Sequence, residues 1–127
     1  MSYVAAHAEN YEGQVVGEGR YQGQCAVFVQ VAAGAPSTLV WKQGELVKGK
    51  TGLAKGTAIA TFGSDGKYTN KSDGTAHGAI YISQSTTGID VWDQWVGQPV
   101  HKRTIQFQSA TTTVTHVNDG NYFYVIE

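Results

Sequence analysis

The separation of helix-type from strand-type sequence along the chain constrains the fold most. Residues 25–34 form an apolar, Ala-rich run, and Gly34 followed by Pro36 is a typical helix stop. The β-branched residues of this run would also suit a strand, but the alanines favour a buried helix. From residue 56 onward, short β-type runs alternate with turn residues. A helix followed by antiparallel strands predicts an α+β domain, with the helix packed on one face of the sheet.

Individual elements follow from the same patterns. We expect strands over 56–62, 103–108 and 122–126, and an antiparallel hairpin formed by 77–83 and 88–95 around a turn at 85–88. A short helix is expected over 3–12, and residues 111–116 are expected to be a strand or a loop. Residues 35–55 are expected to form a long connection that covers Trp41, Leu46 and Val47.

Size and charge restrict the classes of protein to consider. A chain of 127 residues predicts a single domain over 1–127. The net charge is −1, and the most basic cluster is His101-Lys102-Arg103, which is too small to indicate a nucleic-acid partner. No apolar run has the length of a membrane span, so no membrane insertion is expected. The N-terminus lacks a secretory signal pattern, which implies a signal-independent route if the protein acts outside the cytoplasm.

Cys25 is the single cysteine of the chain, so no intramolecular disulfide can form. Its thiol is either a small buried group or a reactive one. Cys25 follows a glycine-rich loop over 17–24 and starts the expected helix. This position favours the reactive form, because the positive end of the helix dipole stabilises a thiolate. We therefore interpret Cys25 as a nucleophile whose backbone N–H, helped by Tyr21, stabilises the oxyanion. No pattern of cysteines or clustered histidines predicts a metal site or another cofactor.

A thiol nucleophile needs a base, and His77 at the start of a predicted strand is the best of four histidines. His101 and His116 lie in polar surroundings and are expected to be solvated. A third polar group should orient the His77 ring, and Asp93 or Gln94 on the partner strand could do so. An even hairpin loop puts Gln94 on the face of His77, whereas an odd loop or a bulge puts Asp93 there. We favour Asp93 because a carboxylate also stabilises the imidazolium.

Four short segments occur in an order that resembles a known family. Residues 23–30 (GQCAVFVQ) resemble the nucleophile motif of the CHAP and NlpC-type cysteine amidases, and 74–82 (GTAHGAIYI) resemble their histidine strand. Residues 88–97 (GIDVWDQWVG) occupy the place of the third catalytic residue, and 55–62 resemble the preceding strand. Within these families the chain is most similar to the peptidoglycan amidase effectors of type VI secretion. In the family, Gly often precedes the histidine, whereas here Ala76 precedes His77 and Gly78 follows it.

The resemblance implies a papain-like core and a cell-wall-degrading toxin that hydrolyses stem or crosslink peptides of peptidoglycan. It also implies delivery by the type VI machinery into the periplasm of a target bacterium, and a cognate immunity protein. Cys25, His77 and Asp93 would be catalytic, and Trp95 is a candidate substrate contact. The alternative from another class is a non-catalytic module that binds cell-wall fragments or glycans through exposed aromatic side chains. An immunity or adaptor protein is a further interpretation without positive support.

Overall fold

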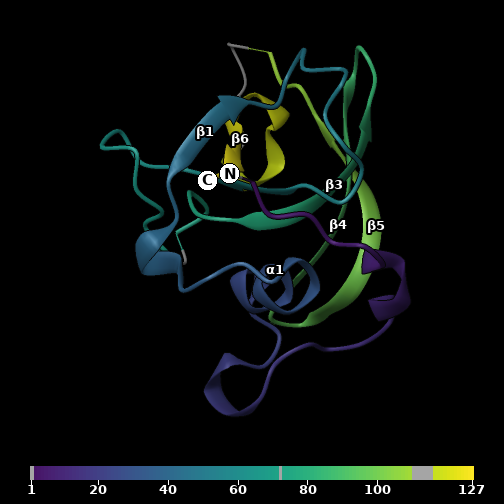
Figure 1. The fold of residues 1–127 in the computed structure, drawn as a ribbon, viewed down its shortest axis with the longest axis vertical. Coiled ribbons are helices and arrows are strands. Elements are labelled where there is room, and N and C mark those ends of the chain that lie inside the picture. Colours follow the sequence, from purple (N-terminus) through teal and green to yellow (C-terminus); the bar gives the residue numbers. More distant parts are fainter. Residues whose placement is uncertain (1, 72, 110–115) are drawn as a thin grey trace.

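A computed structural model describes residues 2–71, 73–109 and 116–127 of the chain. Within these residues, six antiparallel strands form one sheet in the order β1-β6-β2-β3-β4-β5. The helix α1 (Cys25–Ala33) packs across β3 and β4, on one face of the sheet (Figure 1). The strands are β1 (Gln43–Leu46), β2 (Ala58–Thr61), β3 (Gly78–Gln84), β4 (Gly88–Trp95), β5 (Gln98–Gln106) and β6 (Phe123–Ile126). The predicted α+β architecture, with an N-terminal helix on an antiparallel sheet, is confirmed.

The helix forms where the apolar run predicted it and lies close to the sheet. Gly34 ends it in the left-handed conformation, with a φ of +68°, and its N–H donates to the carbonyl of Gln30. Phe28 and Val29 are fully buried against the sheet. A Cβ atom on Gly78 would lie 3.2 Å from Cγ2 of Val29, so the glycine that follows His77 allows the helix to approach β3 this closely.

The N-terminal segment corrects one prediction. Residues 3–12 do not form the expected helix, because their backbone pairs with the start of β2 instead of with itself. Val4 forms a bridge with Thr57, and the N–H of Ala5 donates to the carbonyl of Gly56 over 2.7 Å. Helical geometry is confined to the 3-10 turn η1 (Ala8–Tyr11).

The expected connection over 35–55 contains an additional strand. β1 pairs with β6 and forms one edge of the sheet. Trp41 and Val47 are buried as expected, whereas Leu46 is 41% exposed because it lies on this edge strand. Further 3-10 turns are η2 (Gly19–Tyr21), η3 (Thr38–Val40), η4 (His116–Asn118) and η5 (Gly120–Tyr122).

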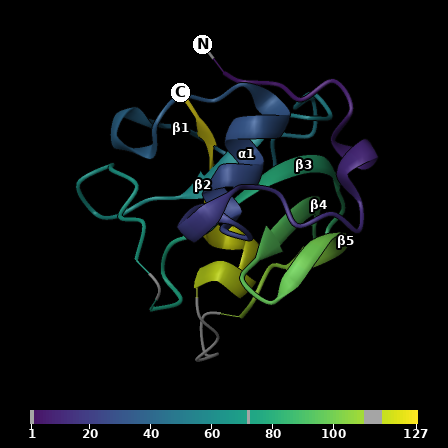
Figure 2. The ribbon, with the colours of Figure 1, turned by 90° about the horizontal axis from the view of Figure 1, so that it is seen from below.

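The β3–β4–β5 meander curves beneath the helix, as Figure 2 shows from a second side. β5 begins at Gln98, five residues before the predicted strand over 103–108, since Trp95 pairs with Gln98 across a two-residue turn that ends in Gly97. Residues 111–115 of the segment expected to be a strand or a loop lie outside the described residues. In the described parts of the chain, none of the helices has the length and apolar character required to cross a bilayer.

Candidate active site

Cys25 is the first residue of α1 and is partly buried. Gly23 precedes it with a φ of +85°, and Gln24 is extended, so the loop turns sharply into the helix at the cysteine. The first N–H groups of an α-helix have no partner within the helix, and their partial positive charge favours a thiolate. Sγ of Cys25 lies 3.6 Å from the hydroxyl oxygen of Tyr68.

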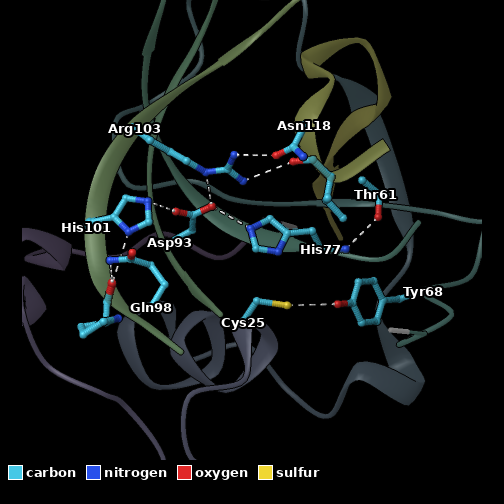
Figure 3. Close-up of polar contacts among 11 residues, drawn as sticks. Cys25, Thr61, Tyr68, His77, Asp93, Gln98, His101, Arg103 and Asn118 are labelled. Carbon is cyan, nitrogen blue, oxygen red and sulfur yellow. Dashed lines mark hydrogen bonds and ion pairs between the residues drawn. The ribbon is translucent and has the colours of Figure 1, made fainter. Parts of the chain in front are cut away.

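His77 lies immediately before β3 and is 4% exposed. Thr61 at the end of β2 fixes its backbone, because the N–H of His77 donates to the Thr61 hydroxyl over 3.0 Å. The N–H of Thr61 donates to the carbonyl of His77 at the same distance. The imidazole therefore projects from a rigid part of the sheet toward the helix N-terminus (Figure 3).

Asp93 on β4 is fully buried and has three basic side chains around its carboxylate. Oδ2 lies 2.7 Å from Nε2 of His77 and accepts a hydrogen bond from Nε of Arg103 over 2.8 Å. Oδ1 lies 3.3 Å from Nε2 of His101 (Figure 3). Since Nε2 of His77 faces Asp93, its Nδ1 is the ring nitrogen left for Cys25.

These contacts shift the pKa values of the thiol and the imidazole in opposite directions. Burial alone would raise the pKa of Cys25, but hydrogen bonding and charge from His77 lower it from 9.0 to about 7. Burial alone would lower the pKa of His77, but Asp93 and Cys25 raise it from 6.5 to about 9. Burial likewise disfavours the ionised Asp93, yet His77 and Arg103 hold the pKa of this carboxyl below its ordinary value. A thiolate beside an imidazolium is thus favoured between about pH 7 and 9.

Gln94 lies on the opposite face of β4 from Asp93 and does not contact His77. Its amide accepts from the N–H of Val16 over 2.9 Å and donates to the carbonyls of Val16 and Gln24 over 3.0 and 2.8 Å. It anchors the loop before Cys25 to the sheet. The structure therefore brings Asp93, and not Gln94, next to the histidine.

Tyr21 does not line the cleft that contains Cys25. It belongs to η2, is 49% exposed, and its hydroxyl accepts a hydrogen bond from Arg20. No contact of Tyr21 among the described residues supports the expectation that it helps to stabilise an oxyanion, which stays a prediction. Trp95, the candidate substrate contact, is 41% exposed, and its ring meets the His101 ring edge-on at 5.0 Å.

An open cleft of about 770 Å³ gives access to the thiol and the imidazole. It is lined by Gln24, Cys25, Tyr68, Asn70, Lys71, Gly74, Ala76, His77, Trp95, Val96, Arg103, Val117 and Asn118. Cys25 and His77 share this cleft, whereas the Asp93 carboxylate is fully buried behind the histidine. A nucleophile, a proton carrier and a buried orienting carboxylate are the parts that covalent acyl transfer requires.

Comparison with protein families shows which family the chain belongs to. The family model of domesticated amidase effector 2 (Dae2) matches residues 2–126. The chain belongs to this family. The type VI secretion amidase effector 2 protein of Salmonella typhi is 34% identical to it, over the whole length of both chains. The domesticated amidase effector 2 of Ixodes scapularis is 42% identical over 68% of this chain and 56% of its own length.

A solved structure agrees with the family. The type 6 secretion amidase effector 2 (Tae2) superimposes with a TM-score of 0.82 at 29% identity, over 98% of this chain and 94% of the other. The predicted resemblance to type VI secretion amidase effectors and the prediction of a hydrolase are therefore confirmed. Cys25, His77 and Asp93 remain candidates for the catalytic roles.

Three further residues of this amidase effector's cleft region were not expected from its sequence. His101 and Arg103 reach Asp93 because β5 starts early enough to pair His101 with Asp93. The turn at Val96-Gly97 is a signal for that hairpin. The contact of His101 with Asp93 corrects the expectation that His101 is solvated. Tyr68 comes from the long connection between β2 and β3, for which local sequence carries no comparable signal.

Proposed function

We propose that the chain hydrolyses amide bonds in the stem or crosslink peptides of peptidoglycan, with Cys25 as nucleophile, His77 as general acid–base and Asp93 as the group that orients His77. The observation that carries the proposal is the 2.7 Å contact between Asp93 and His77, with the free side of the ring toward Cys25 in the open cleft. Membership of an amidase effector family supports amide hydrolysis. The resemblance to type VI effectors supports peptidoglycan as the substrate.

The reaction divides into two acyl transfers. The Cys25 thiolate attacks the carbonyl carbon, the C–S bond forms, and the carbonyl π electrons move to oxygen. When this oxyanion collapses, the C–N bond breaks and the His77 imidazolium gives its proton to the departing amine. Neutral His77 then takes a proton from water as the water oxygen forms a bond to the thioester carbon. When this second oxyanion collapses, the C–S bond breaks, the carboxylic acid product leaves, and the thiolate–imidazolium pair is restored.

Digestion of purified sacculi tests the proposal. The wild-type chain is expected to release muropeptides, whereas Cys25→Ser and His77→Ala lose at least about 10³-fold of the rate. His7→Ala is the matched control, because His7 precedes η1 and its side chain is 73% exposed. This variant should retain full activity. Muropeptide release by Cys25→Ser at the wild-type rate would refute cysteine catalysis. Binding of sacculi without any release by the wild type would favour the non-catalytic module instead. Mass spectrometry of the products identifies the bond that is cut.

Delivery and inhibition belong to the same proposal. We propose that the type VI machinery carries the chain into the periplasm of a target bacterium, and that a cognate immunity protein blocks the Cys25 cleft. Expression in a test bacterium separates the compartments. The chain fused to a periplasmic signal sequence should lyse the cells, whereas the unfused chain and the fused Cys25→Ser variant should not. Equal toxicity of the fused and unfused wild-type chains would contradict a periplasmic target.

A further inference from the structure

Tyr68 is a buried tyrosine whose hydroxyl faces the thiol. It lies in the connection between β2 and β3, and only 9% of the residue is exposed. Its ring packs on Trp41 with a centroid distance of 4.8 Å, and Trp41 is itself fixed by a 2.9 Å hydrogen bond from Nε1 to the carbonyl of Pro36. The Tyr68 hydroxyl is thus held 3.6 Å from Sγ of Cys25 by a rigid support.

The Tyr68 hydroxyl remains protonated while Cys25 is ionised. Burial raises the pKa of the phenol first, and the charge and hydrogen bond of Cys25 raise it further. Against a thiolate, which has no proton, the phenol can act only as donor. His77 loses its proton to the leaving amine during the reaction, but Tyr68 keeps its own and can donate throughout.

The oxyanion forms next to Sγ, because both the sulfur and the oxygen are bonded to the attacked carbon. A donor that already contacts Sγ from the cleft wall therefore lies near the position where negative charge develops. Figure 3 shows His77 and Tyr68 in different directions from Cys25, so the two groups do not compete for one place. The side-chain amide of Gln24, the residue before Cys25, already donates to the carbonyl of Arg20 over 3.3 Å.

We infer that Tyr68 is a catalytic residue of the amidase, whose hydroxyl donates a hydrogen bond to the oxyanion formed when Cys25 attacks, alongside the backbone N–H of Cys25. The hydroxyl moves its hydrogen bond from the resting thiolate to the new oxyanion as charge passes from sulfur to oxygen. This inference rests on the proposed role of Cys25 as nucleophile. It assigns to Tyr68 the role that the sequence suggested for Tyr21.

Two reactions of the same thiol separate oxyanion stabilisation from support of the thiolate. Alkylation by iodoacetamide requires the thiolate but forms no oxyanion, whereas hydrolysis of a soluble cross-linked muropeptide requires both. For Tyr68→Phe we expect kcat/KM of hydrolysis to fall by about 10²–10³. The alkylation rate above pH 9 should stay within about threefold of wild type, since the thiolate is then fully formed. An alkylation midpoint that stays below about pH 8.5, the ordinary pKa of a free cysteine thiol, shows that the site of the variant is folded.

Tyr124→Phe is the matched control, because Tyr124 is a half-buried tyrosine on β6 whose ring packs edge-on against Phe62, 6.4 Å away. It should leave both rates unchanged. Equal losses of hydrolysis and alkylation in Tyr68→Phe would overturn the inference in favour of a role in the thiolate alone, and so would retained hydrolysis. If Cys25→Ser still hydrolyses the muropeptide, both the inference and the proposed mechanism are wrong. If Cys25→Ser is inactive while Tyr68→Phe is active, only the inference is wrong.

Discussion

Replacing Asp93 by Asn removes the charge at the centre of the site with little change of shape. The wild-type carboxylate accepts hydrogen bonds from two donors at one oxygen, at 2.7 Å from His77 and 2.8 Å from Arg103. An amide offers one oxygen and one NH2 group, so it cannot accept equally well from all of the basic side chains around it. Because Asp93 is 0% exposed, water cannot compensate for the lost charge.

The size of the effect follows from the two pKa values. Burial favours the neutral His77 ring, and Asp93 is a main cause that keeps its pKa at about 9. Without the carboxylate, the pKa of His77 falls toward or below its ordinary value of 6.5. Cys25 then loses the imidazolium that holds its pKa at about 7, and the thiolate becomes rare at neutral pH. We expect kcat/KM to fall by about 10²–10⁴, the upper figure being the loss for the same change in serine-protease triads.

The pH dependence of iodoacetamide alkylation measures this loss directly. The wild-type rate should rise with a midpoint near pH 7. The Asp93→Asn midpoint should move to about 8.5 or above, which lowers the alkylation rate at pH 7 by about tenfold or more. Asp90→Asn is the matched control, since Asp90 lies on the other face of β4 and accepts from the Thr104 hydroxyl. An Asp93→Asn midpoint that remains near pH 7 would refute the electrostatic account.

Two further predictions concern stability and use urea denaturation. Gln94→Leu should lower the free energy of unfolding by about 1–3 kcal/mol. It leaves the Val16 N–H without its acceptor, and it removes one of the two hydrogen bonds that the carbonyls of Val16 and Gln24 each accept. An unchanged value would contradict an anchoring role. The second prediction concerns pH. The raised pKa of His77 gives stability that is present below pH 6.5 and is lost as the pH rises through about 9. The lowered pKa of Cys25 gives stability that is present above pH 9.0 and is lost as the pH falls through about 7. Between pH 7 and 9 the pair binds one proton in both the folded and the unfolded chain, so wild-type stability should be nearly flat there. Cys25→Ser retains only the histidine contribution and should lose stability with rising pH; parallel curves for the two proteins would contradict the ion pair.

Local sequence predicted the elements that carry the nucleophile and the base. The apolar run after Gly23 is long enough and well enough terminated to indicate a helix, and the alternation after His77 indicates a strand. β1 was missed because it is a short edge strand, held in place mainly by pairing with β6. Residues 3–12 have helix-forming alanines, but backbone hydrogen bonds to the start of β2 outweigh this weak propensity. Such long-range pairings leave no local pattern.

Two register shifts on either side of the Asp93 position decide which polar side chains meet in the site. Ser83 pairs with Asp90, whereas Tyr81 pairs with Val91, so one extra residue of β3 lies between these pairs. Because side chains alternate between faces, this shift puts His77 on the face of Asp93, where an uninterrupted hairpin would have chosen Gln94.

The second register shift, between Asp93 and Trp95, acts in the same way on β5. It pairs Asp93 with His101, whereas continuous pairing from Trp95 and Gln98 would have placed Val100 there. His101 and Arg103 would then have faced away from the carboxylate. Val100, which is 1% exposed, would have left the hydrophobic cluster that it shares with Phe28 and Val29 of the helix and would have faced Asp93 instead. The burial of Val100 therefore favours the same register that surrounds Asp93 with basic side chains. Packing of the hydrophobic core and assembly of the charged site thus favour the same strand register. Neither the hairpin turn nor the alternation within a single strand specifies this register.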